Sequence, residues 1–402
     1  MCASMLSNRI LRMPASETLA MSRRSSELQS QGIDVINLSI GEPDFDTPEL
    51  IKKAGVEGIE KNFTHYPPVP GYLDLREAIA KKLIRDNNLE YKPSQIVVSN
   101  GAKHSLTNVF LATLNEGDEV IIPTPYWVSY PALVQLCDGI SVYIKAGIEQ
   151  NFKVTAAQIQ SAITSKTKLL ILNSPSNPTG MVYTHSELRA IANVLLANPQ
   201  VYVVADEIYE YINFSGKHES LAQFPEIKDR VIVVNGVSKG YAMTGWRIGY
   251  IAACDEIAGA CSKIQGQMTS AASSIAQRAA IAAMTEDPKK SESIQSMVKT
   301  FKERRDVVMS ELSAIPGLSV NMPEGAFYVF LNIKEFINKS YKNYTIHTGA
   351  DLANYLLDEA HVALVGGDAF GDPQCVRISY ATKMERLVEA IARIKTALTK
   401  LA

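Results

Sequence analysis

Long apolar runs and clustered charges are both missing from this sequence of 402 residues. No uninterrupted hydrophobic stretch approaches the roughly 20 residues that a membrane helix needs, and the first 20 residues lack the apolar core of a signal peptide. No basic block or stripe of lysines, arginines and aromatics indicates nucleic-acid binding. With 46% apolar residues, 20% charged residues and a net charge of -2, the composition predicts a soluble globular protein without a membrane or nucleic-acid partner.

Cysteine and histidine are scarce and scattered. The six histidines form no cluster with cysteines or acids, so no metal site is predicted. The number of cysteines is odd and no CxxC pair occurs, which is typical of free thiols in a reducing cytoplasm. The cysteines are Cys2, Cys137, Cys254, Cys261 and Cys375.

The length and the middle of the chain predict an α/β protein of more than one domain. From about residue 95 to 255, short β-branched runs alternate with amphipathic stretches such as 102–114 and 186–198. Continuous apolar strands between helices indicate a largely parallel sheet covered on both faces, with ligands beyond the carboxyl ends of the strands. The predicted strands are Gln95–Ser99, Glu119–Ile122, Lys168–Asn173, Val201–Asp206, Val231–Asn235 and Arg247–Ala253.

The last third of the chain reads as a second, smaller α+β domain. A long charged helix is expected over Pro288–Ala314, followed by elements at 326–332, 350–360 and 375–380 and a final helix from Lys383. The N-terminal segment has too little apolar material for a core of its own and is expected to join this domain.

Lys239 lies in a small-residue loop between two apolar runs, with Arg247 eight positions further on. An amine that attacks carbonyls must be partly unprotonated near neutral pH, which requires a desolvated or cation-flanked pocket. Arginine is well suited to bind a phosphate. The pair indicates a lysine in Schiff-base linkage to pyridoxal phosphate (PLP), although each residue alone could be an ordinary loop or structural residue.

Two segments at strand ends could contact such a cofactor. Ser99–Lys103 opens a helix with small residues, so its free backbone amides make a good phosphate seat. In the segment 173–180, two prolines and a glycine fix the backbone that would present Asn177. Each segment could equally be a simple turn.

Asp206 ends an apolar strand, and Tyr209 follows three residues later. A buried aspartate there could keep the pyridine nitrogen of PLP protonated. A helix-capping role is the alternative. A magnesium site for phosphoryl transfer would need a GxxxxGK[ST] loop, which the sequence does not contain.

Two further side chains could complete a site. Tyr126 and Trp127 follow a strand and could stack on a cofactor ring, or simply pack in the core. Arg377 lies in an apolar strand, where an unpaired guanidinium is costly, so it should meet a carboxylate of either the protein or a substrate.

Taken together, these segments resemble the class I/II PLP-dependent aminotransferases of fold type I, and among them most of all the bacterial, thermophile-type aspartate aminotransferases. The resemblance spans nearly the whole chain and rests on 41–48, 66–71, 126–130, 177–180, 206–209, 238–239, 243–249, 325–328 and 377–380. It implies a mainly parallel seven-stranded sheet between helices. The implied parts are an N-terminal segment 1–47 that joins the small domain, a large PLP-binding domain 48–290 and a small C-terminal domain 291–402.

The resemblance also assigns roles around the cofactor. Lys239 would form the internal aldimine and then move the proton between Cα and C4′, and Asp206 would pair with the pyridine nitrogen. Tyr209 and Asn177 would hydrogen-bond the ring hydroxyl, and Trp127 would stack on the ring. The other implied cofactor-binding residues are Gly101, Ala102, Lys103, Ser238, Arg247 and, from a neighbouring subunit, Tyr66.

The implied reaction is the conversion of aspartate and 2-oxoglutarate to oxaloacetate and glutamate by a cytoplasmic homodimer with ping-pong kinetics. Arg377 would bind the substrate α-carboxylate with Asn177, Trp127 and the backbone of Gly41, while Lys103 would meet the distal carboxylate. Many relatives have a serine three residues before the lysine that helps to bind the phosphate, whereas this chain has Gly236.

Rival functions follow from the same resemblance. A prephenate or aromatic aminotransferase is the main alternative, and a carbon–sulfur lyase is another. Some prephenate-active members carry a lysine or arginine directly before an N-terminal proline, whereas here Met13 precedes Pro14 and Arg12 stands one position earlier. A PLP-sensing transcription regulator is not expected, because only about 40 residues without a helix-turn-helix pattern precede Gly41.

Overall fold

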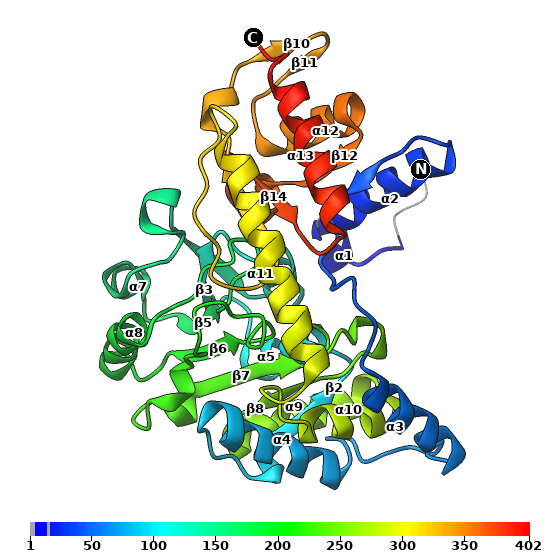
Figure 1. The fold of residues 1–402 in the computed structure, drawn as a ribbon. Helices are drawn as coiled ribbons and strands as arrows, with labels where there is room; N and C mark the ends of the chain where they lie inside the picture. The colour runs from blue at the N-terminus through cyan, green and yellow to red at the C-terminus, as the bar shows by residue number, and fades with distance from the viewer. Residues whose placement is uncertain (1–4, 14–16) are drawn as a thin grey trace.

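The computed structural model describes residues 5–13 and 17–402. Its centre is a seven-stranded sheet that helices cover on both faces (Figure 1). The strands lie side by side in the order β2 (Ile96–Ser99), β8 (Gly249–Ala252), β7 (Val231–Gly236), β6 (Tyr202–Asp206), β5 (Thr167–Asn173), β3 (Glu119–Thr124) and β4 (Ile140–Lys145). All neighbours are parallel except those of β8, which runs antiparallel to both β2 and β7. The predicted α/β fold with a mainly parallel sheet is confirmed.

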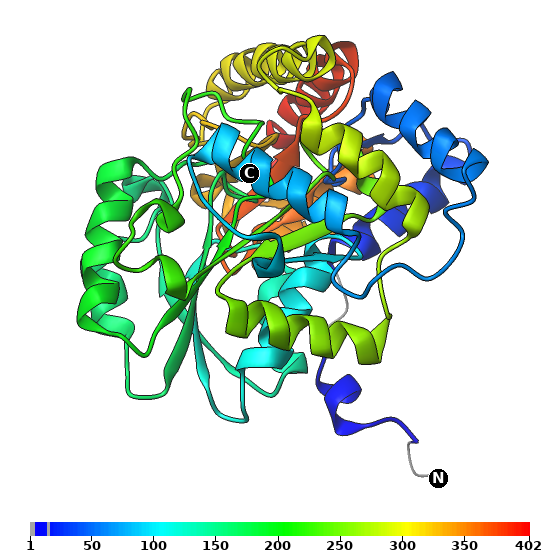
Figure 2. The ribbon, with the colours of Figure 1, turned by 90° about the horizontal axis from the view of Figure 1, so that it is seen from below.

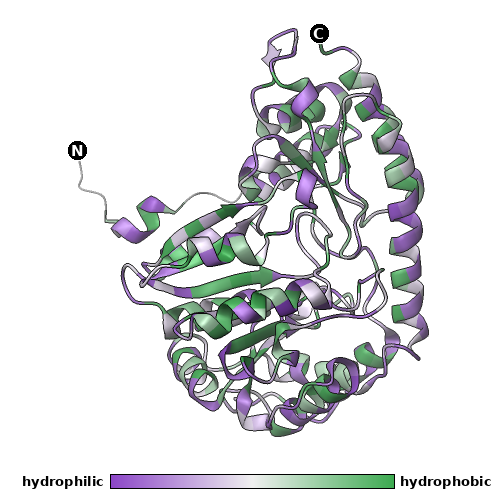
Figure 3. Ribbon diagram, turned by 90° about the vertical axis from the view of Figure 1, so that its left-hand side faces the viewer, coloured by the Kyte–Doolittle hydropathy of each residue, from purple (hydrophilic) through white to green (hydrophobic). Residues whose placement is uncertain are grey.

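Successive side chains of each strand point to opposite faces of the sheet, which explains why helices cover both faces. Val204 and Ile232 point into one apolar cluster, whereas their neighbours Val203 and Val233 point into the other. A strand buried on both faces must be apolar at every position, and the strands carry hydrophobic colour along their length (Figure 3). One face is covered by α5 (Ala102–Thr113), α6 (Ser129–Leu136) and α9 (Asp255–Met268). The other is covered by α3 (Glu49–Glu60), α4 (Leu73–Asn87), α7 (Ala156–Ala162), α8 (His185–Ala197) and α10 (Ser274–Thr285).

A second group of elements packs around a separate apolar cluster. The long helix α11 (Glu292–Ser313) runs from the central sheet toward this group (Figure 1). The group contains the antiparallel sheet β13 (Val365–Gly366), β14 (Cys375–Ser379) and β9 (Tyr328–Asn332), the hairpin β10 (Ser340–Tyr341) and β11 (Tyr344–Thr345), and the helices α12 (Gly349–Ala360) and α13 (Met384–Leu398). The division of the chain at 47/48 and 290/291 stays a prediction.

The N-terminal segment lies against this second group. Strand β1 (Ile36–Asn37) pairs in parallel with β12 (Val362–Ala363), and Arg24 of α2 (Glu17–Ser30) forms an ion pair of 2.7 Å with Asp358 of α12. The short helix α1 (Asn8–Arg12) lies at the periphery of the molecule (Figure 2), where Arg9 reaches Asp138 at 2.7 Å.

Three expectations from the sequence need correction. Strand β4 was not among the predicted strands, because its burial alternates irregularly and Ile140 and Tyr143 are exposed. Arg247 was placed inside a strand, but it precedes β8 in a left-handed conformation with φ of 57°. The long charged helix begins at Glu292 rather than at Pro288, because Ser291 caps it by accepting a hydrogen bond from the amide of Ile294.

None of the helices in the described residues is long and apolar enough to cross a membrane.

Candidate active site

The buried amine of Lys239 lies in the loop that follows β7. Its Nζ donates a hydrogen bond to the backbone oxygen of Gly41 and lies 5.8 Å from the centre of the Tyr209 ring. Burial, together with the charges of Arg377 and Arg247, lowers the pKa of Lys239 to about 8, while the carboxylates of Glu42 and Asp206 oppose this shift. An amine with this pKa is partly neutral near physiological pH and can act as a nucleophile or a base.

Asp206, at the carboxyl end of β6, is almost completely buried. One of its carboxylate oxygens accepts a hydrogen bond of 2.7 Å from the hydroxyl of Tyr130, and the other accepts one of 3.3 Å from the amide of Ile208. Burial raises the pKa of Asp206 to about 6, although the hydrogen bond from Tyr130 opposes this rise. A turn rather than a helix follows, so Asp206 is not a helix cap.

A chain of hydrogen bonds connects this strand end to Arg377 of β14. Asn173 donates to the backbone oxygen of Asp206 at 2.9 Å and accepts from the amide of Asn177 at 2.7 Å. The side-chain oxygen of Asn177 in turn accepts from Arg377 at 3.0 Å, and the other terminal nitrogen of Arg377 donates to the backbone oxygen of Ser39 at 2.6 Å. The buried Nε of Arg377 has no hydrogen-bond partner among the described residues. This guanidinium is therefore fixed in place but only partly satisfied.

Two tyrosines form one wall beside Arg377. The hydroxyls of Tyr209 and Tyr328 are 2.9 Å apart, and the guanidinium of Arg377 lies 4.6 Å from the centre of the Tyr328 ring. Gly41 allows this wall to come close, because a Cβ there would lie 2.6 Å from the Tyr328 hydroxyl oxygen. Burial raises the pKa of Tyr209 well above its ordinary value, so its hydroxyl stays protonated and can donate a hydrogen bond.

An anion seat lies where Arg247 meets the start of α5. A Cβ on Gly101, whose φ is +84°, would lie 2.2 Å from a terminal nitrogen of Arg247, so only glycine allows this approach. Hydrogen bonds of 2.8 Å to the backbone oxygen of Thr244 and 3.3 Å to that of Asn100 hold the guanidinium there. The backbone amides of Ala102 and Lys103 donate no hydrogen bond to any of the described residues, as expected at a helix start.

The position of Gly236 explains why no serine stands there. A Cβ on this residue would lie 2.7 Å from the backbone oxygen of Ile248 and 2.9 Å from the Cα of Gly249. A side chain would therefore push β7 and β8 apart. Ser238, two residues later, is buried, and its backbone oxygen accepts from the amide of Met243 to close the loop around Lys239.

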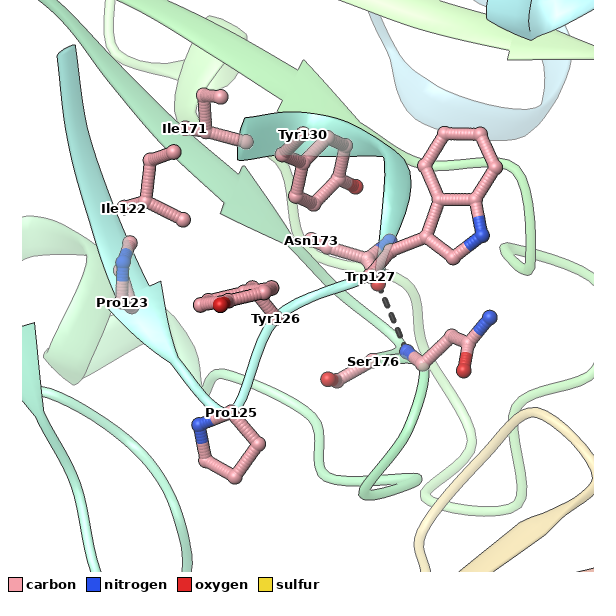
Figure 4. A pocket seen from close by; sticks show the side chains of 10 residues that line it. Ile122, Pro123, Pro125, Tyr126, Trp127, Tyr130, Ile171, Asn173 and Ser176 are labelled. Atoms are coloured by element: carbon pink, nitrogen blue, oxygen red, sulfur yellow. Dashed lines mark hydrogen bonds between the residues drawn. The ribbon is translucent and has the colours of Figure 1, made fainter. Parts of the chain in front are cut away.

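Lys103 and Trp127 flank the site from α5 and from the loop after β3. The Nζ of Lys103 lies 5.0 Å from the centre of the Trp127 ring. Partial burial, and secondarily the charge of Arg247, lower the pKa of Lys103. Figure 4 shows Trp127 beside Tyr130 and Tyr126, at the rim of a hollow that Asn173 and Asn177 also line. Lys239, Asp206 and Arg247 do not line this hollow, so it borders the candidate site rather than forming it.

Tyr66 stands apart from all other site residues. Its side chain is 94% exposed, and none of its contacts in the single chain involves Lys239 or Arg247. The remaining site residues meet at the carboxyl edge of the central sheet and the adjoining β14.

Some neighbours of the site received no role from the sequence. Tyr130 binds Asp206, Tyr328 binds Tyr209, and the backbone of Ser39 binds Arg377. Tyr130 and Tyr328 both lie within segments that carry the family resemblance, but only the folded chain shows which side chains they contact. No side-chain pattern could reveal Ser39, because it acts through its backbone oxygen.

Comparisons with known proteins agree with this geometry. The sequence model of the family "Aminotransferase class I and II" matches residues 33–394. An aspartate aminotransferase from Bacillus sp. (strain YM-2) is 47% identical, covering 97% of this chain and 98% of the relative. A probable aspartate/prephenate aminotransferase from Rhizobium leguminosarum bv. phaseoli is 48% identical, with coverage of 97% and 98%. The crystal structure of the aspartate aminotransferase from Rhizobium meliloti superposes with a TM-score of 0.95 at 41% identity and covers all of both chains. The chain belongs to the class I and II aminotransferases.

Proposed function

We propose that this chain is a PLP-dependent aminotransferase that converts aspartate and 2-oxoglutarate to oxaloacetate and glutamate. The observation that carries the proposal is the buried amine of Lys239, with its lowered pKa, close to Asp206, Tyr209 and two arginines. An amine that can attack a carbonyl, together with a nearby carboxylate and nearby guanidiniums, supplies the groups that this chemistry requires.

The residues present fit PLP. Arg247 and the free amides of Ala102 and Lys103 offer donors to a phosphate, and the absence of a Cβ at Gly101 lets Arg247 lie close to these amides. Asp206 would hold the proton on the ring nitrogen, and Asn177 and Tyr209 would bind the ring hydroxyl. Trp127 would stack on the ring. Once bound, PLP supplies a carbonyl that condenses with amines and a ring that accepts electrons from the amino-acid Cα.

Lys239 would move the proton. Because the pKa of its amine lies near 8, a fraction of the amine is neutral and would take a proton from the substrate Cα and deliver it to C4′ of the cofactor. A positioned acid–base group of this kind typically contributes about 10²- to 10⁴-fold in rate. The backbone oxygen of Gly41 accepts a hydrogen bond from this amine and orients it when the amine is free.

Arg377 would bind the α-carboxylate that all amino-acid and 2-oxo-acid substrates share. Its partly satisfied guanidinium is already oriented by Asn177 and Ser39, so a carboxylate can be bound with little loss of side-chain entropy. Since donor and acceptor would use the same arginine, they must occupy the site in turn, which gives ping-pong kinetics.

Lys103 would select acidic substrates. Its ammonium is only partly buried, sits over Trp127 and has no ion-pair partner within the described residues. A flexible ammonium can meet the distal carboxylate of either aspartate or 2-oxoglutarate, which differ in length by one methylene.

A prephenate or aromatic aminotransferase is the second candidate, supported by the name of the Rhizobium leguminosarum relative. Met13 occupies the position directly before Pro14, and the basic Arg12 one position earlier lies 3.4 Å from Asp138 in an exposed ion pair. Pro14 lies outside the described residues.

We further propose a cytoplasmic homodimer in which Tyr66 reaches the phosphate of the partner subunit. A tyrosine that is 94% exposed gains nothing from its own chain. Other large apolar side chains between residues 50 and 73 are also more than half exposed, which is typical of a surface that another protein covers. They are Leu50, Val56, Ile59 and Leu73. The four cysteines in the described residues are unpaired, as suits a reducing compartment.

Borohydride reduction of the PLP-loaded enzyme should attach the cofactor to Lys239, because this is the buried lysine with the lowered pKa. Peptide mapping by mass spectrometry measures the position. Lys239→Ala should keep some PLP without covalent attachment. The control variant Lys263→Ala, which changes an exposed lysine, should still be labelled at Lys239. Attachment at a different lysine in the wild-type protein would refute the assignment.

Replacing Lys103 by serine should lower kcat/KM for aspartate steeply and leave that for alanine nearly unchanged, because the substitution keeps the backbone amide and removes the charge. A desolvated charge pair contributes about 2–4 kcal/mol, or roughly 30- to 1000-fold in discrimination. Lys166→Ser, on an exposed loop, is the control. An equal loss for both donors together with weaker PLP retention would mean that Lys103 serves the phosphate instead.

Mixing inactive Lys239→Ala chains with Tyr66→Ala chains should restore activity after subunit exchange. One of the two sites in each hybrid dimer then combines an intact Lys239 with an intact Tyr66 of the partner subunit. Native mass spectrometry establishes that hybrids form, and the transamination rate is compared with that of each parent. If hybrids form and the rate stays at the level of the Tyr66→Ala parent, Tyr66 acts within its own chain or not at all.

A further inference from the structure

A buried ion pair joins α4 to the turn that carries Asp206 and Tyr209. Lys82 of α4 is completely buried, and its ammonium contacts the carboxylate of Glu210, which is 6% exposed. Taking two charges out of water is costly, and an apolar pair of similar volume often gives an equally stable fold. Stability alone therefore does not account for this pair.

Glu210 connects three segments of the chain through one carboxylate. One of its oxygens accepts from Lys82 of α4 and from the side-chain amide of Asn235 at 2.9 Å. Its other oxygen accepts from Asn87, at the end of α4, at 2.8 Å. Lys82 also donates to the side-chain oxygen of Asn87 at 2.8 Å. The carboxylate and the ammonium therefore use most of their hydrogen-bonding capacity on each other and on these two amides.

The two connected loops are those that would hold and activate the cofactor. Glu210 directly follows Tyr209, and the amide of Glu207 in the same turn donates to the backbone oxygen of Val234 in β7. Asn235 follows in β7, and its side-chain oxygen accepts from the amide of Gly236 at 2.7 Å, three residues before Lys239. Glu210 is therefore the sequence neighbour of Tyr209, and Asn235 lies only a few residues before Lys239.

Other charged and titratable groups surround the pair. Asp86 lies 3.9 Å from the ammonium of Lys82 and accepts from the hydroxyl of Tyr211, whose ring lies 5.1 Å from that ammonium. Glu207 points to the same side, where it lies 2.9 Å from His218. None of these groups donates to or accepts from Asn235 within the described residues, so among them Glu210 is the side chain that contacts Asn235 of β7.

We propose that Glu210, held in place by Lys82, is a positioning residue that fixes the turn carrying Asp206 and Tyr209 relative to the loop carrying Lys239. The inference rests on the proposed role of Lys239. A shift of about 1 Å between reacting groups can cost 10²-fold in rate. Besides backbone pairing and this contact, the two segments also meet where Tyr211 packs against Tyr241, with 5.5 Å between the ring centres.

Two double variants separate this role from simple stabilisation. Lys82→Met with Glu210→Leu removes both charges and the acceptor for Asn235. Lys82→Met with Glu210→Gln also removes both charges but keeps a side-chain oxygen that can accept from Asn235. Neither variant leaves a buried charge without its partner, so both should fold, which circular dichroism and thermal unfolding of the full chain will show.

The first measurement needs no cofactor. In the apoprotein, the rate at which acetic anhydride labels Lys239 is followed against pH by peptide mass spectrometry, and its midpoint in the wild type should lie near the pKa of about 8. In the leucine variant the loop relaxes and the amine gains solvent, so the midpoint should rise by about one pH unit. In the glutamine variant it should stay at the wild-type value.

The second measurement uses the PLP-loaded enzyme. The leucine variant should lose about 10- to 100-fold in kcat with little change in KM for aspartate, because positioning and not substrate binding is impaired. The glutamine variant should stay within about threefold of the wild type.

The proposal is overturned if the folded leucine variant keeps both the wild-type labelling midpoint and the wild-type kcat, or if the glutamine variant loses as much as the leucine variant. Should the leucine variant not fold, Asn235→Ala removes the same contact while keeping the ion pair, and unchanged behaviour of that variant also overturns the proposal. An error in the proposed function can be told apart from an error in this proposal. In the former case, borohydride would attach the cofactor to a lysine other than Lys239 in the wild type.

Discussion

The buried positive charge at the carboxyl edge of the central sheet is the constraint on which the rest of the site depends. Arg377 is almost completely removed from water and Lys239 is partly buried, while Arg247 lies close enough to lower the pKa values of both Lys239 and Lys103. Burial and mutual repulsion both lower the pKa values of Lys239 and Lys103. A partly desolvated pocket with an excess of positive charge is costly unless anions enter it. Phosphate and carboxylate ligands supply that charge, so the site is organised to receive them.

Two features of the fold offset this cost. Glycines allow side chains of the site to pack closely against the backbone, and backbone oxygens accept hydrogen bonds from the cations. Gly101 lets Arg247 lie against the start of α5, and Gly41 lets Tyr328 close the wall beside Arg377. Backbone oxygens of residues far away in sequence accept from the cations before any ligand binds, as Ser39 does for Arg377 and Asn100 for Arg247. The donors are therefore already oriented, and little reorganisation opposes ligand binding.

Sequence patterns could predict the architecture and the chemical types at the site. The apolar runs of β5, β6 and β7 were visible because both faces of these strands are buried, whereas the exposed edge strand β4 has no such pattern. The eight-residue spacing of Lys239 and Arg247 pointed to a phosphorylated aldehyde. The pattern could not show that Arg247 adopts a left-handed backbone or that Tyr130 reaches Asp206, because these contacts depend on packing between distant segments. The sequence showed a missing serine at Gly236, but only the spacing of β7 and β8 gives the reason.

The most direct test is to compare how tightly the apoprotein binds PLP and pyridoxal, which lacks the phosphate. If several cations of the site bind the phosphate together, the wild type should prefer PLP by at least about 30-fold, since breaking a charged hydrogen-bonded contact costs roughly 2–5 kcal/mol. Arg247→Leu should lose most of this preference while keeping its affinity for pyridoxal. Equal binding of PLP and pyridoxal by the wild-type apoprotein would contradict the account.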